Sequence, residues 1–170
     1  MSDLSFDAVL VANRGEIAVR VLTAAREAGL RGVAVFSDAD AKALHVEVSD
    51  EAIHLPGETL AETYLNSDAI IAAAKSSGAQ AIHPGYGFLS ERAEFASAVK
   101  QAGLVWIGPP PKAISTMGDK ISARSKMMES GVPVIPGEEL SVPDGPDHLG
   151  QLAACAATVS YTHLTLPTKA

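Results

Sequence analysis

The sequence AQAIHPGYGFLSE at residues 79–91 passes from a short apolar run to a turn and then to a helical pattern that starts at Ser90. An apolar run of this length is typical of a buried strand. The turn contains Pro84, Gly85 and Gly87, so its backbone can bend sharply and approach a ligand closely. Ligands of α/β proteins bind at the carboxyl ends of the strands, which makes this turn a candidate site.

The same pattern recurs on both sides of this segment. Residues 8–12 are evenly apolar and predict a strand buried on both faces. Residues 16–28 repeat apolar side chains at helical spacing, and Gly29 provides a C-terminal stop. Further strands are predicted at 32–36, 52–55, 80–83 and 104–107, and further helices at 68–77 and 90–101.

Strands that alternate with crossover helices favour a parallel sheet covered on both faces. We therefore predict an α/β fold, a Rossmann-like three-layer domain with a parallel sheet, over residues 5–110. Three prolines at 109–111 interrupt this regularity, and short helices are predicted at 112–117 and 122–130.

Composition narrows the classes of partner. The 170 residues carry a net charge of −7 and no run of Lys or Arg, which argues against nucleic acid or an anionic membrane as the main partner. The single cysteine, Cys155, excludes an internal disulfide and a thiolate zinc cluster. Residues 1–7 lack the features of a secretory signal, and no stretch of about 18 apolar residues occurs. We expect a soluble, cytoplasmic protein.

The first turn, Asn13-Arg14-Gly15-Glu16, lies where dinucleotide-binding proteins place three glycines, and only Gly15 is present. This argues against NAD or FAD. Asn13 or the nearby amides could bind an anion at the helix N-terminus, or the turn could simply close the strand onto the helix. His45, His54 and His83 are not spaced as metal ligands on one element, so we expect no metal site.

Four ordered segments resemble the biotin carboxylases, the ATP-dependent enzymes that carboxylate biotin. They are HPGYGFLSE at 83–91, ANRGEIA at 12–18, His45-Val46 with Asp50-Glu51-Ala52, and IGP at 107–109 leading to MGDK at 117–120. The resemblance covers residues 5–140. It implies that residues 5–110 are the N-terminal, pre-ATP-grasp domain and that 111–140 form a helical linker toward an ATP-grasp domain.

The resemblance also implies roles for individual residues. Tyr86 would line the pocket where the ureido ring of biotin meets bicarbonate, with His83, Gly85 and Gly87 in its vicinity. From the residues alone, a hydrogen-bonded structural histidine is the first expectation for His83, and a proton-transfer role is the alternative. Lys120 would contact an ATP phosphate, and Asp119 could cap the helix that follows.

Arg20 and Glu27 lie on the polar side of the first helix, which the resemblance places near a homodimer contact. The alternative is that both are solvated surface charges. The full-length relative would use ATP, Mg²⁺ and biotin, and its partners would be bicarbonate and a biotin carboxyl carrier domain.

The family's ATP-grasp domain, with its catalytic arginine and metal-binding carboxylates, does not occur in these residues. We therefore assign no catalytic residue and no metal ligand, and expect an inactive fragment that binds none of the cofactors tightly. The tail at 160–170, SYTHLTLPTKA, does not resemble the family. We expect residues 141–170 to form a loop and a disordered or artefactual tail.

Two other hypotheses stay open. One is a stand-alone Rossmann-like module that binds a nucleotide or a protein without catalysis. The other is a different ATP-grasp ligase such as a carbamoyl-phosphate synthetase, although the run at 83–91 is typical of biotin-dependent members. The acceptor is not identified: acetyl-CoA or propionyl-CoA is our first expectation, and methylcrotonyl-CoA, pyruvate and urea remain possible.

Overall fold

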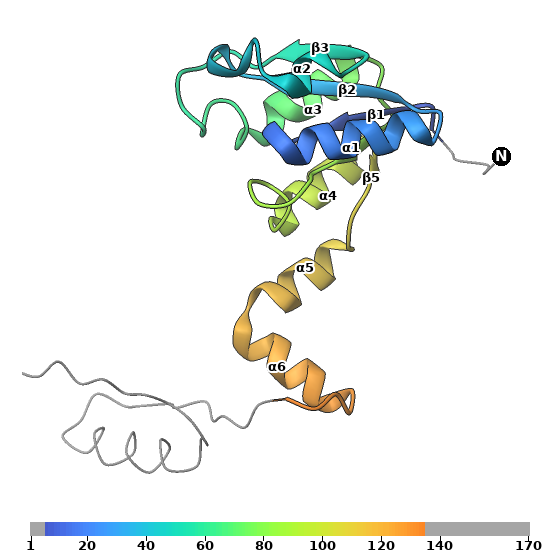
Figure 1. Ribbon diagram of the computed structural model, residues 1–170. Coiled ribbons are helices and arrows are strands. Elements are labelled where there is room, and N and C mark those ends of the chain that lie inside the picture. The colour runs from blue at the N-terminus through green and yellow to red at the C-terminus, as the bar shows by residue number, and fades with distance from the viewer. Residues whose placement is uncertain (1–5, 135–170) are drawn as a thin grey trace, which may run out of the picture. The chain divides into compact units, whose positions relative to one another are not determined.

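The computed structural model describes residues 6–134, which form two compact units, one ending at Gly118 and one beginning at Asp119. The first unit is built on a five-stranded parallel sheet in the order β3-β2-β1-β4-β5 (Figure 1). Its strands are β1 Ala8–Val11, β2 Arg31–Phe36, β3 Glu51–His54, β4 Ala81–His83 and β5 Val105–Trp106. Its helices are α1 Gly15–Glu27, the 3₁₀ helix η1 Asp38–Asp40, α2 Leu44–Glu47, α3 Ser67–Ser76, α4 Ala93–Gln101 and α5 Pro111–Gly118.

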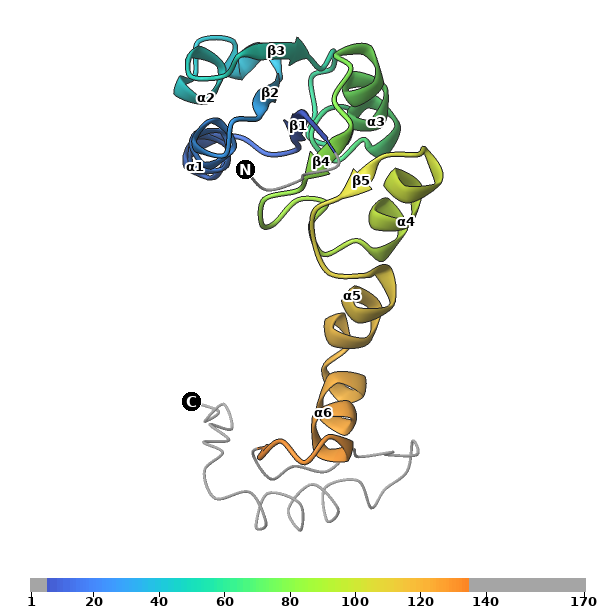
Figure 2. The ribbon, with the colours of Figure 1, turned by 90° about the vertical axis from the view of Figure 1, so that its right-hand side faces the viewer.

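Helices cover both faces of the sheet. Helices α1 and α2 lie on one face, and α3 and α4 lie on the other (Figure 2). The side chains of β1 alternate between the two layers: Leu10 packs in the large cluster with Ile70 and Phe95, whereas Val11 packs with Leu22 of α1. The predicted three-layer α/β fold is confirmed.

All four residues of β1 are buried, because the central strand of a doubly covered sheet has no solvent-facing side. The strand therefore reads as a continuous apolar run, which is why the sequence predicts it so clearly. Strand β1 lies between β2 and β4, with Val11 opposite Ala34 on one side and His83 on the other. This order places the ends of β1 and β4 next to each other.

The prediction that a helix starts at Ser90 is wrong, because α4 begins at Ala93. Residues 88–91 form turns instead, and the Ser90 amide donates to the Gly87 carbonyl at 2.9 Å. Leu89 is buried within the turn, so the sequence there has an apolar residue where a helix would also place one. The sequence also missed η1 and α2, which are too short to show a helical period.

Helix α5 belongs to the first unit, since Ile114 is buried in the main core cluster. The second unit contains α6, Lys120–Glu129. Asp119 is its N-cap, and its carboxylate accepts a hydrogen bond from the Ser122 amide at 2.7 Å, which confirms the predicted cap. None of the described helices is long and apolar enough to cross a membrane. The predictions for the tail at 141–170 lie outside the described residues.

Candidate functional site

Two turns meet at the carboxyl edge of the sheet, one after β1 and one after β4. The Ala12 amide donates to the His83 carbonyl at 2.9 Å, which extends the pairing of the two strands by one step. Beyond it, the buried side-chain amide of Asn13 donates to the carbonyls of Pro84 at 3.0 Å and Tyr86 at 2.9 Å. Both of its hydrogens are therefore used, so this side chain closes one turn on the other and is not available to bind an anion.

The turn after β4 contains the predicted residues around Tyr86. Gly85 and Gly87 have φ values of 67° and 70°, a region that other residues rarely adopt. Tyr86 lies between them with 70% of its surface exposed, so its side chain is available to a ligand. His83 is half-buried, its Nδ1 accepts from the Gly85 amide at 2.9 Å, and burial lowers its pKa. The ring thus helps to shape the turn.

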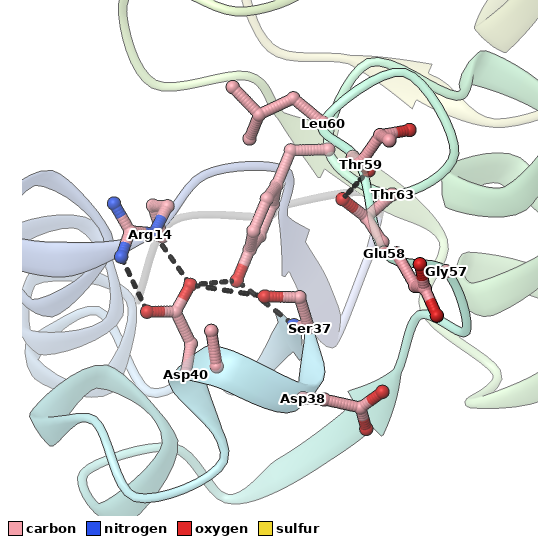
Figure 3. Close-up of a pocket in the computed structure, with 11 residues that line it drawn as sticks. Arg14, Ser37, Asp38, Asp40, Gly57, Glu58, Thr59, Leu60 and Thr63 are labelled. Atoms are coloured by element: carbon pink, nitrogen blue, oxygen red, sulfur yellow. Dashed lines mark hydrogen bonds and ion pairs between the residues drawn. The ribbon is translucent and has the colours of Figure 1, made fainter.

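A pocket of about 480 Å³ opens beside the end of β2 (Figure 3). Arg14 forms a bidentate ion pair with Asp40 there, at 2.6 Å from Nε and 2.5 Å from Nη2. The Tyr64 hydroxyl donates to the same carboxylate at 2.6 Å and accepts from the Ser37 amide at 3.1 Å. None of the predicted site residues lines this pocket. Its lining is Arg14, Ser37, Asp38, Ala39, Asp40, Gly57, Glu58, Thr59, Leu60, Thr63 and Tyr64.

These contacts shift the titration of all three groups. The hydrogen bonds from Arg14 hold the pKa of Asp40 at about 2, below its usual value, and the bond with Asp40 raises the pKa of Arg14. Burial raises the pKa of Tyr64, as does its bond to the Asp40 carboxylate. At neutral pH the cluster is therefore a charged Arg14–Asp40 pair with a neutral phenol.

Sequence reasoning missed Asp40 and Tyr64 as members of this cluster. Asp40 could have been suspected, because it follows the end of a predicted strand by a few residues, where parallel sheets gather polar side chains. Tyr64 lies in an irregular segment between β3 and α3, and no local signal indicates that it reaches back to β2. Only the folded chain brings them together.

Arg20 and His83 both line a second, mostly apolar groove of about 350 Å³ between α1 and the β4–β5 side of the sheet. Arg20 and Glu27 are exposed on α1, seven residues apart and thus on the same side of the helix. Whether they form a dimer contact stays a prediction. Both are accessible for one.

Lys120 lies in the second compact unit, in the first turn of α6, and is exposed. Its ammonium group can donate three hydrogen bonds, which suits a phosphate. Among residues 6–134, no group of three or more His, Cys, Asp or Glu side chains is placed to hold a metal ion.

His45 is a buried histidine outside the turns described above. Its Nε2 lies 3.2 Å from the Val35 carbonyl, its Nδ1 has no hydrogen-bond partner, and burial lowers its pKa. Because its folded-state pKa lies below that of the unfolded chain, the unfolded chain binds the proton more readily as the pH falls below about 6.5.

We therefore expect the free energy of unfolding to fall between pH 7 and pH 5, and to fall less in His45→Gln, which keeps a donor for Val35. Urea titrations at the two pH values measure this. Equal losses in both proteins would show that His45 is not the group responsible. Glu47→Gln, an exposed neighbour in the same helix, is the control.

Residues 5–114 match the family described as "Biotin carboxylase, N-terminal domain". The alpha3 subunit of a biotin-dependent acyl-coenzyme A carboxylase from Mycobacterium leprae is 57% identical over 129 residues, which are 76% of this chain and 22% of that protein. A biotin carboxylase from Halalkalibacterium halodurans is 50% identical over 139 residues, 82% of this chain and 31% of that protein.

A solved structure agrees with these relatives. The biotin carboxylase domain dimer of Hydrogenobacter thermophilus 2-oxoglutarate carboxylase, in complex with MgADP and bicarbonate, superposes with a TM-score of 0.79 at 42% identity. The superposition covers 88% of this chain and 32% of that one, so this chain spans less than a third of its length. The resemblance noted from the four sequence segments is confirmed: this chain belongs to the biotin carboxylase family and corresponds to its N-terminal domain.

Proposed function

We propose that this chain is the N-terminal part of a biotin carboxylase that, at full length, carboxylates biotin with ATP and bicarbonate. The proposal is carried by the turn at 83–91, which holds Tyr86 exposed at the carboxyl edge of the sheet in a chain of this family. A relative crystallised with MgADP and bicarbonate supports the choice of ligands. When bound, ATP would provide the phosphoryl group that activates bicarbonate.

The chain's own residues would share this work. Tyr86, with His83, Gly85 and Gly87, would line the pocket where biotin meets bicarbonate, and Lys120 would contact an ATP phosphate. Arg20 and Glu27 would contact a second copy in the full-length homodimer. The other proposed partner is a biotin carboxyl carrier domain. The proposed location of the full-length enzyme is the cytoplasm. Mg²⁺ would be held by the ATP-grasp domain of the full-length enzyme.

The chain by itself should not turn over ATP in the presence of bicarbonate and biotin. Phosphoryl transfer needs a metal ion and several cations around the phosphates, and Lys120 alone cannot replace them. Phosphate release measured with and without bicarbonate tests this, and bicarbonate-dependent release would contradict it. Calorimetry with MgATP should likewise detect no dissociation constant below the millimolar range.

Calorimetry also separates the alternative function. A stand-alone nucleotide-binding module would bind MgATP with a low-micromolar dissociation constant without catalysis. The pocket beside Arg14, of about 480 Å³, is large enough for a small molecule and is the candidate site for such binding. Loss of MgATP binding in Asp40→Asn would assign that binding to this pocket.

Lys120→Ala should raise the KM for ATP about tenfold or more in a full-length carboxylase that carries residues 6–134 of this chain. The variant removes a charge-assisted hydrogen bond to a phosphate, and an effect of this size is expected for such a bond. Lys126→Ala is the matched control, because this exposed lysine in the same helix pairs with Glu129 at 3.0 Å. An unchanged KM in Lys120→Ala would remove the residue from the site.

A further inference from the structure

The turn that carries Tyr86 is held from outside its own strand and helix. The main support is Asn13, which follows β1 and is only 3% exposed. Its Nδ2 donates to the carbonyls of Pro84 and Tyr86 at 3.0 and 2.9 Å, and its Oδ1 accepts from the Arg14 amide at 2.9 Å. The side chain thus bonds the backbone on both sides of Gly85 and that of its own turn.

The chemistry of this contact requires an amide. Both partners across the gap are carbonyl oxygens, so the group between them must donate twice, and Oδ1 must face its own backbone. An aspartate has the same shape, but its carboxylate would place an oxygen against two oxygens. No other side chain of similar size offers two donors on one atom and an acceptor beside it.

Packing at Gly85 makes the fit close. A Cβ atom at this position, where φ is 67°, would lie 2.6 Å from Asn13 Nδ2 and 2.9 Å from Ile17 Cγ2. The turn is therefore seated directly on the Asn13 amide and the first turn of α1. A shift of Asn13 would be transmitted to the backbone on either side of Gly85.

The turn also contains backbone strain, which an external support must offset. Phe88 has a φ of 44°, the one positive value for a residue other than glycine in the described part of the chain. Its ring stacks on that of Tyr64, with centroids 5.5 Å apart and planes 16° apart. A strained residue persists only where its surroundings determine its conformation, and such residues concentrate at functional sites.

We infer that Asn13 is a positioning residue: its amide holds the backbone from which Tyr86 projects, and so sets where the phenol meets the substrate. This inference rests on the proposed role of Tyr86 in the biotin pocket. Asn13 itself would touch no substrate. It acts through the carbonyls of Pro84 and Tyr86.

The first test needs no substitution. In the 170-residue chain, both side-chain amide hydrogens of Asn13 should exchange with solvent about tenfold or more slowly than those of Asn66, the only other asparagine. Asn66 lies at the start of α3, and its Nδ2 makes one exposed bond, to the Glu62 carbonyl at 3.3 Å. Equal exchange of the two side chains by NMR would overturn the inference.

The second test is hydrogen exchange of the backbone amides of residues 85–90 in Asn13→Asp. At pH 8 exchange should rise about tenfold over the unmutated chain, the effect of losing one or more buried hydrogen bonds. At pH 5 the rise should be smaller, since a protonated carboxyl can again donate to one carbonyl. Asn66→Asp adds the same charge at a helix N-terminus, which tolerates it, and should leave the amide exchange of residues 85–90 unchanged.

If the exchange rate of the turn in Asn13→Asp rises no more than in Asn66→Asp, the inference is overturned. An equal rise in the turn and in β2 would also overturn it, because it would mean general unfolding. If Asn13→Asp does not fold, the side-chain exchange in the unmutated chain still decides.

The third test separates this inference from the proposed function. In the full-length carboxylase carrying residues 6–134, Asn13→Asp should lower kcat/KM for free biotin about tenfold while KM for ATP changes by less than roughly twofold. If Tyr86→Ala leaves biotin kinetics unchanged, the proposed role of Tyr86 is wrong, whatever the exchange data show. If Tyr86→Ala impairs the enzyme but Asn13→Asp changes neither exchange nor kinetics, the function stands and the positioning role falls.

Discussion

Phe95→Ala should lower the free energy of unfolding by about 3–5 kcal/mol, the cost of removing a large aromatic side chain from a packed core. Phe95 lies on α4 and is 1% exposed. Its ring forms a T-shaped contact with that of Trp106 on β5, with centroids 5.5 Å apart and planes at 89°. The contact joins α4 to the edge strand β5 within the main core cluster, so the substitution would leave a cavity in that core. Small domains are stable by about 5–15 kcal/mol, so the loss is a large share of the total.

Urea unfolding followed by tryptophan fluorescence measures this directly, because Trp106 is the only tryptophan in the chain. Val105→Ala is the control, since Val105 adjoins Trp106 but is 38% exposed, and it should cost less than about 1 kcal/mol. Phe95→Leu should retain part of the stability. A loss below about 1 kcal/mol in Phe95→Ala would contradict the placement of this ring in the core.

Asp40→Asn should lower the free energy of unfolding by about 2 kcal/mol at pH 7. The pKa of Asp40 is lowered from 3.8 to about 2, which corresponds to slightly more than 2 kcal/mol. The Arg14 side chain is 46% exposed, so solvent screening reduces this amount. Asparagine also replaces one of the two acceptor oxygens with an NH2 group, which sets a donor against Arg14 or the Tyr64 hydroxyl and restores part of the cost. Thermal or urea unfolding of the two proteins measures the difference.

The pH dependence supplies an independent check. The pKa of Asp40 is lower in the folded chain than in the unfolded chain, so the unfolded chain takes up the proton first. Its contribution is therefore complete above about pH 4 and is lost as the pH falls toward 2. The acid loss should be smaller in Asp40→Asn. Asp38→Asn is the control, because that side chain is 80% exposed and should change stability by less than about 0.5 kcal/mol. Identical acid curves for Asp40→Asn and the unmutated chain would refute the pairing.

Much of the fold follows from patterns that are local in the chain. The evenly apolar run at residues 8–12 and the helical period at 16–28 predict β1 and α1 to within one residue at each end. Both signals are strong because burial on two faces, or on one helical stripe, selects residue types at every position. The predicted start of α4 is wrong because burial also occurs outside helices. Leu89 is buried in a turn, and periodicity alone cannot distinguish a buried turn residue from a buried helical residue.

The candidate site divides in the same way. The sequence by itself determined the alternation of strands and helices, the turn that exposes Tyr86, and the four segments that relate the chain to its family, because each depends on residues close together in the chain. Only the tertiary structure decided that Asn13 bonds the Tyr86 carbonyl, 73 residues away, and that Asp40 joins Arg14 to Tyr64. Those contacts depend on which strands become neighbours. The strand order is decided by the packing of the whole sheet, and no single segment of the sequence determines it.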